Sequence, residues 1–568
     1  MEDSAVKAGF ENLKNGNDYI SLYEAAQARE RADWLTGMNL SRLYTLVYGG
    51  GDKISIGRVM TPTLAMICER DTKVEGFVKE KYYTVHLGDG KGIDAVSEKL
   101  FDAGEAEKLK KLVDGKQARV SEVTEENKKI QPPLLYDLTS LQRDCNRIFG
   151  FSANKTLEIA QELYEEKLTT YPRTDAKVLT DDMEDTALKA FAACCLRFDF
   201  AAGKTPVNVK RILNSKKVSD HHAIIPTGNN EGIDKLANDV RLVYDIISIR
   251  VIAALSEAYE YKSMSADIIC EDVHFLMTGT CCTKQGFKEI EQAFKKKNGG
   301  CGEEQKEKEL PDIKQYYTFA AQADVKEDYT KPPSYYTEDS LLSAMESAGK
   351  KEMASEVERK GLGTSATRAG TIEKLIDNGY VIREGKKLIS TEAGRYIIKV
   401  IPERVKSVEL TCDWENELLE VSKGKVSYDM FMDKVNQFID ELVSEGKKTV
   451  PVPRKNAEKN VLAKCPYCGS QLISGKFGAY CEGKCGIFLT GPAGKLTDEQ
   501  VVKLFAEQKE VLLKNLTSQK GSKYDAYIKY DTTEKFTYQD KEGTQREGIR
   551  IKYSMRFPEN KKNKKKKG

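Results

Sequence analysis

Four cysteines near the C-terminus constrain the fold of their segment more tightly than any other feature of the sequence. Cys465 and Cys468 form a CxxC pair, and a second pair, Cys481 and Cys485, follows after a short interval. Two such pairs can present four thiolates to one tetrahedral zinc ion at about 2.3 Å per bond. A segment this short has little apolar core in which to bury four unliganded cysteines. We therefore predict a structural Zn²⁺ held by a zinc ribbon at residues 460–490.

The remaining cysteines indicate the cell compartment, and the charges exclude a protein that is strongly basic overall. Of the 13 cysteines, those outside this cluster stand singly or as the vicinal pairs at 194–195 and 281–282, which is typical of a reducing compartment. Lys+Arg 90 against Asp+Glu 88 gives a net charge of +2, so a nucleic-acid site has to come from local charge. The sequence has no run of about 18 apolar residues and no signal peptide. These features predict a cytoplasmic protein without a membrane partner.

The pattern along the chain predicts a multidomain α/β protein rich in helix. At about 100–200 residues per domain, a chain of this length corresponds to several domains. Alternating segments at Tyr82–Leu87 and Met264–Gly286 flank a helical stretch, which predicts one sheet that the chain leaves and re-enters. A turn and strands at Gly379–Ser390 would suit a small winged-helix element. Helices are expected within Tyr23–Leu43, Leu138–Tyr164, Val240–Glu260 and Ser340–Gly446.

The segment Leu168–Asp175 carries a tyrosine, Tyr171, two residues before an arginine, Arg173. A phenol beside a cation can attack a phosphodiester and keep the bond energy in a covalent intermediate, which permits resealing without ATP. A phenol with a pKa near 10 still needs help to ionise. A Tyr-x-Arg triplet by itself is more often part of an ordinary turn. It therefore indicates a nucleophile only in combination with other motifs of the sequence.

Several motifs, in the same order along the chain, resemble those of the type IA DNA topoisomerases, specifically the topoisomerase III branch. Ser55-Ile-Gly-Arg58-Val-Met60-Thr-Pro-Thr-Leu64 is similar to the family's SxGRVQTPTL motif, and Leu168–Leu179 is similar to its nucleophile motif. The resemblance covers about residues 5–450. Further matching segments are Arg31–Arg42, Gln131–Gln142, Asp220–Thr227 and Gly361–Arg368.

The resemblance implies roles for individual residues. Tyr171 would be the nucleophile that forms a 5′-phosphotyrosine bond and frees a 3′-hydroxyl, and Arg173 would neutralise the phosphate. His221 matches the family histidine near the scissile phosphate, with His222 as its nearest competitor. Without the family pattern, Arg29 and Arg58 would suit a solvated helix face equally well, and Thr364 would suit an ordinary helix cap. The positions implied to face DNA are Arg29, Asp33, Ser41, Ser55, Gly57, Arg58, Thr61, Thr364, Ser365 and Arg368.

The resemblance and the pattern of the sequence together predict the domains. Residues 1–450 would form the catalytic region, and a lysine-rich tail at 556–568 would add nonspecific, salt-sensitive affinity for DNA. A small C-terminal module with a strand at Asp525–Tyr530 is expected between the ribbon and this tail. The divisions are the DNA-facing helical wall at 1–65 and 340–450, the β-containing gate arch at 66–135 and 260–339, the tyrosine domain at 136–259, the zinc ribbon at 460–490 and the C-terminal module at 491–555.

Two departures from the family pattern shape these expectations. Type IA enzymes begin with a Toprim domain, whose glutamate and DxDxE cluster bind Mg²⁺, whereas this sequence begins with residues that resemble the segment after Toprim and contains no Asp-x-Asp. We expect the Mg²⁺ ligands to be absent and activity to need a Toprim domain, for instance from a separate Toprim-containing polypeptide. Met60 stands where the family usually has Gln, so one polar contact to DNA is lost.

The predicted function is therefore that of an ATP-independent DNA topoisomerase. It would cut one strand of single-stranded or underwound DNA through Tyr171, pass a strand through the gap and reseal it, relaxing or decatenating DNA. The alternative is a non-catalytic remnant that binds single-stranded DNA. A tyrosine recombinase or a relaxase fits less well. Recombinases need several dispersed Arg and His residues around the tyrosine, relaxases need a histidine cluster that binds a metal, and the histidine count of this chain is only 4.

Overall fold

The computed structural model divides the chain into two compact units, Met1–Val452 and Pro453–Gly568, and each is described by itself. Within the described residues, no helix is both long enough and apolar enough to span a bilayer. The residues described are 7, 9–229, 232–298, 313–353, 361–452, 461–475, 478–492, 494–517, 523–539 and 545–558.

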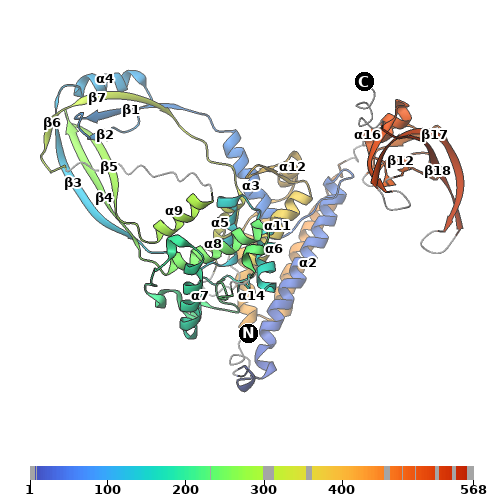
Figure 1. Cartoon of the computed structure of the whole chain (residues 1–568), viewed down its shortest axis with the longest axis horizontal. Helices are drawn as coiled ribbons and strands as arrows, with labels where there is room; N and C mark the ends of the chain where they lie inside the picture. The colour runs from blue at the N-terminus through green and yellow to red at the C-terminus, as the bar shows by residue number, and fades with distance from the viewer. Residues whose placement is uncertain are drawn as a thin grey trace, which may run out of the picture. The chain divides into compact units, whose positions relative to one another are not determined.

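A curved antiparallel sheet in the first unit has the strand order β6-β3-β4-β5-β2-β1-β7 (Figure 1). Three strands precede the helices on either side of the Tyr171 loop, and four strands follow α8. This order confirms the predicted sheet that the chain leaves and re-enters. In β4, alternate residues from Met264 to Cys270 are buried. Helix α4 (Ala103–Val113) packs against β1 and β7. The strands are β1 (Lys81–Gly88), β2 (Asp94–Val96), β3 (Gln117–Ile130), β4 (Tyr259–Cys270), β5 (Val273–Lys284), β6 (Thr318–Ala320) and β7 (Gln322–Tyr329).

A helical bundle forms between β3 and β4 around a central, largely buried helix, α8 (Asn238–Ala254). Its apolar core includes Leu141, Leu163 and Ile247. The helix predicted at Val240–Glu260 ends sooner than expected, because β4 already begins at Tyr259. The other helices of this bundle are α5 (Leu138–Phe149), α6 (Ala153–Glu165), α7 (Glu184–Leu196) and, between β5 and β6, α9 (Phe287–Lys297).

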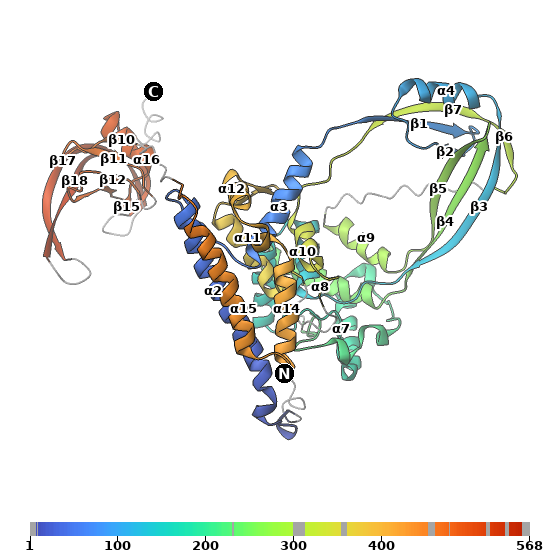
Figure 2. The same ribbon diagram turned by 180° about the vertical axis from the view of Figure 1, so that it is seen from behind.

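A second set of helices surrounds the long helix α2 (Ile20–Tyr48), which lies beside α15 (Tyr428–Lys447) in Figure 2. Small residues such as Ala28 and Ala32 let α2 approach Trp414 closely. The predicted turn and strands at Gly379–Ser390 are confirmed as the hairpin of β8 and β9. The remaining elements are α3 (Met60–Glu75), α10 (Glu338–Ser347), α11 (Ser365–Asp377), β8 (Val381–Glu384), β9 (Lys387–Ser390), α12 (Glu392–Val400), α13 (Glu403–Lys406) and α14 (Glu409–Ser422).

Short helical turns connect these elements. Each spans only one or two turns and contributes few buried side chains to the cores. They are η1 (Gly16–Tyr19), η2 (Asp181–Met183), η3 (Asp199–Ala201), η4 (Val209–Ile212), η5 (Ser215–Lys217) and η6 (Ile233–Lys235).

The second unit contains two main sheets around one apolar cluster. A three-stranded sheet, β10-β11-β12, carries the cysteines, and a four-stranded sheet, β13-β18-β17-β16, follows it. Leu472 of the first sheet and Ile528 of the second lie in the same cluster, so the two predicted segments share a core. The strand predicted at Asp525–Tyr530 is confirmed within β17. The elements are β10 (Val461–Lys464), β11 (Gln471–Ile473), β12 (Tyr480–Cys481), β13 (Ile487–Phe488), β14 (Thr490–Gly491), β15 (Gly494–Lys495), α16 (Asp498–Val501), η7 (Val502–Ala506), β16 (Val511–Thr517), β17 (Lys523–Gln539) and β18 (Gln545–Arg556).

One predicted segment lies mainly outside the described residues. This is the lysine-rich tail, of which residues 559–568 are not described.

Candidate active site and metal centre

The loop that carries Tyr171 is held against a neighbouring loop by hydrogen bonds. Thr170 donates its N–H to the Ile225 carbonyl at 2.9 Å and its hydroxyl to the Ala223 carbonyl at 3.1 Å. The N–H of Ile225 donates in return to the Thr170 hydroxyl at 3.0 Å. Residues 221–227 are therefore fixed beside the predicted nucleophile.

Tyr171 is half-buried and lies beside His221. Their ring centroids are 4.4 Å apart. The Thr174 hydroxyl donates to the His221 carbonyl at 2.7 Å, which ties the histidine backbone to the tyrosine loop. His222 instead has its Nδ1 at 2.9 Å from the Ala223 carbonyl. The structure thus brings His221, and not its neighbour, to the ring of Tyr171.

Arg173 lies on the same loop as Tyr171 and is exposed. Within the described part of the chain its guanidinium has no hydrogen-bond or ion-pair partner. An exposed, uncommitted guanidinium can bind a phosphate through two parallel hydrogen bonds. The geometry therefore leaves Arg173 available to an anion that approaches Tyr171.

Hydrogen bonds anchor the Ser55–Thr61 segment to helix α2 and to the β8–β9 region. The N–H of Ser55 donates to the Tyr380 hydroxyl at 2.8 Å, and the N–H of residue 56 donates to Ser41 Oγ at 2.8 Å. Gly57 donates its N–H to Thr61 Oγ1 at 3.1 Å. Ser41, Gly57 and Thr61, expected to face DNA, thus have polar atoms that hold the segment in place.

Arg58 is buried and paired with two carboxylates. Its Nε lies 2.6 Å from Asp33 Oδ1 and its Nη1 lies 2.8 Å from Glu415 Oε1. Arg29 binds the other oxygen of Glu415 at 2.9 Å. Burial alone would lower the pKa of Arg58, but the adjacent carboxylates raise it above its usual value. The guanidinium predicted to face DNA is therefore committed to an internal ion-pair network.

This network supports a prediction about stability. Replacing Glu415 by glutamine is expected to lower the free energy of unfolding by about 3 kcal/mol, because it leaves two arginines around an uncharged amide in a buried site. Urea unfolding followed by tryptophan fluorescence measures it, since Trp414 lies 5.8 Å from the Arg58 guanidinium. As a control, Glu441→Gln removes an exposed partner of Arg404 and should cost under about 1 kcal/mol. Equal losses for both variants would show that the buried network is not a stabilising unit.

The start of α11 supplies another group of predicted residues. Thr364 is its N-cap and exchanges hydrogen bonds with Thr367, so the ordinary helix cap is present. Ser365 follows as the first residue of the helix. Arg368 is buried and donates to the Leu362 carbonyl at 3.2 Å, and burial lowers the pKa of this arginine. A pocket of about 190 Å³ is lined by residues that include Asp33, Arg58, Gly363, Thr364 and Glu415.

The four cysteines of the second unit converge as predicted. Their sulfur atoms all lie within 4.8 Å of one another. Cys465 Sγ lies 3.7 Å from Cys485 Sγ, and Cys468 Sγ lies 3.4 Å from Cys481 Sγ. Four sulfurs at about 2.3 Å from a tetrahedral zinc would be about 3.8 Å apart. The donor set and its spacing therefore fit Zn²⁺.

Comparison with known proteins assigns the chain to a family. The sequence profile of a family described as DNA topoisomerase matches residues 17–433. The chain belongs to the DNA topoisomerase family. It is 34% identical over 502 residues to a protein named DNA topoisomerase 3 from Bacillus cereus (strain ATCC 14579), covering 84% of this chain and 68% of that protein. It is also 34% identical over 514 residues to DNA topoisomerase 3 of Bacillus subtilis (strain 168), covering 86% and 70%.

A solved structure agrees with this assignment at the level of fold. Full-length topoisomerase I from Thermotoga maritima superposes with a TM-score of 0.58 and 23% sequence identity, covering 85% of this chain and 78% of that chain. The resemblance to type IA topoisomerases of the topoisomerase III branch, inferred from the motifs, is thus confirmed.

The described residues of this topoisomerase contain no group of three or more carboxylate or histidine side chains that could share a Mg²⁺ ion. Within the described ranges, the cysteine cluster is the one group of three or more His, Cys, Asp or Glu side chains close enough to share an ion. Asp175, on the tyrosine loop, is exposed and is not part of such a group.

Sequence reasoning about the topoisomerase motifs missed Glu415 and Tyr164. Glu415 lies on the buried face of α14 with Thr411 and Leu418, and a carboxylate at an otherwise buried helical position is a signal that could have revealed it. Tyr164 contacts Tyr171 with ring centroids 5.2 Å apart. Its position on the last turn of a predicted helix, shortly before the nucleophile motif, was the available sign.

Proposed function

We propose that this chain carries out the strand-cutting and resealing steps of a type IA DNA topoisomerase, with Tyr171 as the nucleophile. The phenol oxygen attacks a backbone phosphorus, the bond from phosphorus to the 3′-oxygen breaks, and a 5′-phosphotyrosine forms. The phenol proton leaves and the 3′-oxygen gains a proton. Because one phosphodiester replaces another, resealing by the 3′-hydroxyl needs no ATP.

The contact of Tyr171 with His221 is the observation that carries this proposal. It places an imidazole next to the phenol on a loop fixed by hydrogen bonds. An imidazole can stabilise charge near neutral pH and move a proton. Arg173 has no partner within the described residues, and its cation would offset negative charge on the phosphate as the bond forms.

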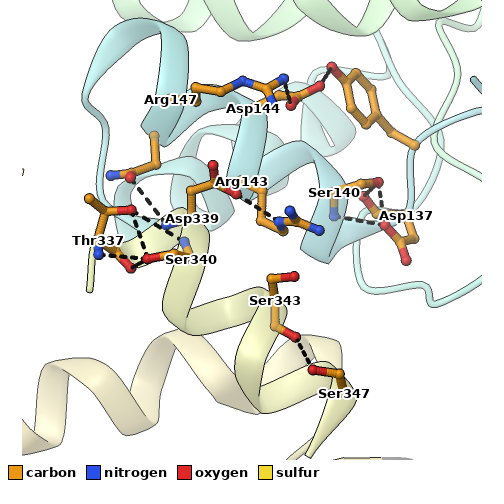
Figure 3. Close-up of polar contacts among 12 residues, drawn as sticks. Asp137, Ser140, Arg143, Asp144, Arg147, Thr337, Asp339, Ser340, Ser343 and Ser347 are labelled. Atoms are coloured by element: carbon orange, nitrogen blue, oxygen red, sulfur yellow. Dashed lines mark hydrogen bonds and ion pairs between the residues drawn. The ribbon is translucent and has the colours of Figure 1, made fainter. Parts of the chain in front are cut away.

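Strand passage requires the helices around Tyr171 to separate from the helices around α2, and polar contacts join the two sets. Figure 3 shows that Arg143 of α5 pairs with Asp339 of α10. The Nε of Arg143 lies 2.7 Å from Oδ1 of Asp339. Glu338 accepts the N–H of Ala153, the first residue of α6, at 2.6 Å, and burial raises the pKa of the Glu338 carboxyl. The two sets of helices have separate main apolar cores. Groups in polar contacts regain hydrogen bonds with water when they separate, so their separation costs less than exposure of an apolar core.

A cleavage assay with the full chain tests the proposal, and a separate Toprim-containing polypeptide is added because the sequence predicts that activity needs a Toprim domain. The substrate is a single-stranded oligonucleotide labelled at its 3′ end, with Mg²⁺, because a 5′-phosphotyrosine keeps the 3′-labelled fragment on the protein. We expect a labelled covalent complex after denaturation, with the label on the peptide that contains Tyr171. Relaxation of a negatively supercoiled plasmid would follow from the same chemistry. A protein that binds the oligonucleotide and never becomes labelled would contradict the proposal.

The second candidate is a non-catalytic protein that binds single-stranded DNA. It is favoured by the lack of a gathered carboxylate group among the described residues. It predicts binding that weakens with salt and is unaffected by Tyr171→Phe. The described cysteines are unpaired, which fits either candidate acting on DNA in the reducing cytoplasm.

A further inference from the structure

Tyr164 lies against the predicted nucleophile although no motif assignment includes it. It occupies the last turn of α6, and its ring meets that of Tyr171 edge to face, with centroids 5.2 Å apart and planes at 80°. The reversal after the helix produces this contact. Lys167 adopts a left-handed conformation with φ 59° and donates its N–H to the Tyr164 carbonyl at 2.9 Å. The chain therefore turns back, and Tyr171 returns to the helix end.

Ring contacts, and not hydrogen bonds, fix the direction of the Tyr171 side chain. Within the described residues its hydroxyl has no hydrogen-bond partner, whereas its ring touches Tyr164 from α6 and His221 from a separate loop. Edge-to-face and tilted ring pairs at these distances favour defined orientations. Two such contacts from independent segments restrict the rotamers of Tyr171.

Tyr164 contributes little to the packing of its own helix. Its side chain is 40% exposed, whereas Leu163 and Ala160 of the same helix are fully buried in the apolar core. Loss of the Tyr164 ring should therefore leave α6 folded. What it would remove is one of the two ring contacts of Tyr171.

We propose that Tyr164 is a positioning residue for Tyr171. Its ring holds the Tyr171 phenol in the direction needed for in-line attack on the DNA phosphate. This inference rests on the proposed function, because a defined direction matters only if Tyr171 attacks. A displacement of about 1 Å at a reacting group can cost on the order of 10²-fold in rate. The edge-to-face contact, and not the Tyr164 hydroxyl, carries the role, so phenylalanine should replace tyrosine at 164.

The first test reports on the orientation of Tyr171 without any reaction. The full chain carries 3-fluorotyrosine at position 171, and its ¹⁹F resonance is recorded without DNA. We expect Tyr164→Leu to shift and broaden the resonance, and Tyr164→Phe to leave it nearly unchanged. Tyr261→Leu is the matched control, because it removes one ring of another pair, Tyr259–Tyr261, in the sheet. An unchanged resonance in Tyr164→Leu would overturn the inference.

The second test links orientation to chemistry. With the 3′-labelled oligonucleotide at saturation, Tyr164→Leu should form the covalent complex about tenfold more slowly or worse, with the affinity for DNA unchanged and the rate restored in Tyr164→Phe. A Tyr164→Leu variant that cleaves at the wild-type rate overturns the inference and leaves the proposed function intact. A wild-type chain that forms no complex overturns the proposed function, and the positioning role falls with it.

Discussion

Replacing Tyr171 by phenylalanine is expected to reduce formation of the covalent DNA complex by at least about 10³-fold, the size of loss seen when an enzyme loses its nucleophile. The substitution removes one oxygen, which has no hydrogen-bond partner within the described residues, and keeps the ring that contacts Tyr164 and His221. The fold and the affinity for single-stranded DNA should therefore be preserved. The measurements are the covalent complex formed on a 3′-labelled oligonucleotide and the Kd from fluorescence anisotropy.

The matched control is Tyr316→Phe, which removes a phenol oxygen from a residue that is 66% exposed elsewhere in the first unit. It should cleave and bind as the wild type does. Retention of the covalent complex in the Tyr171→Phe variant would mean that another side chain is the nucleophile. A parallel loss of affinity in that variant would show that the phenol oxygen takes part in binding.

The sequence predicted features that depend on local spacing. The convergence of four cysteines follows from two short cysteine pairs, and the sheet that the chain leaves and re-enters follows from alternating segments on either side of a helical stretch. Helix positions were also predicted, although not their ends. The helix predicted within Tyr23–Leu43 extends over Ile20–Tyr48 in the structure. Backbone hydrogen bonds continue at both ends beyond the residues that show apolar periodicity.

Contacts between distant segments could not be predicted in this way. Arg58 was expected to face DNA, but its partner Glu415 lies 357 residues away along the chain, and no pattern in either segment shows that they meet. The shared core of the second unit brings together Leu472 and Ile528, which lie in different sheets and far apart along the chain. The proximity of Tyr171 and His221 was expected only through the family resemblance, since periodicity contains no information about which loops lie together.

The buried position of Arg58 changes how the SxGRV-like segment is understood. Its arginine and Ser41 hold the segment against α2 and α14. Thr364 lines the same small pocket as Arg58. The ion-paired side chains of Asp33, Arg58 and Glu415 also line that pocket, next to the start of α11.

Removal of zinc is expected to disrupt the second unit and leave the first intact. The protein should contain one zinc per chain, and Cys465→Ser should lose it. The hydrogen bonds around the cysteines should then break, including those from Cys465 N–H to the Ser470 carbonyl at 2.7 Å and from Gly469 N–H to the Cys465 carbonyl at 3.0 Å. Structural zinc contributes about 10–16 kcal/mol in zinc-finger peptides, so amide exchange at residues 461–475 and 478–492 should accelerate by at least about 10³-fold.

The two tryptophans separate this effect from a general loss of structure. Trp34 and Trp414 both lie in the first unit, so their fluorescence and its urea midpoint should not change when zinc is removed. Cys281→Ser, at a half-buried cysteine outside the cluster, should retain the zinc and the slow exchange. If the Cys465→Ser variant keeps both, the four sulfurs do not form a metal centre. A fall in the urea midpoint of tryptophan fluorescence on zinc loss would instead mean that the second unit stabilises the first. The four clustered cysteines themselves are not part of the apolar cores around α2 and α8.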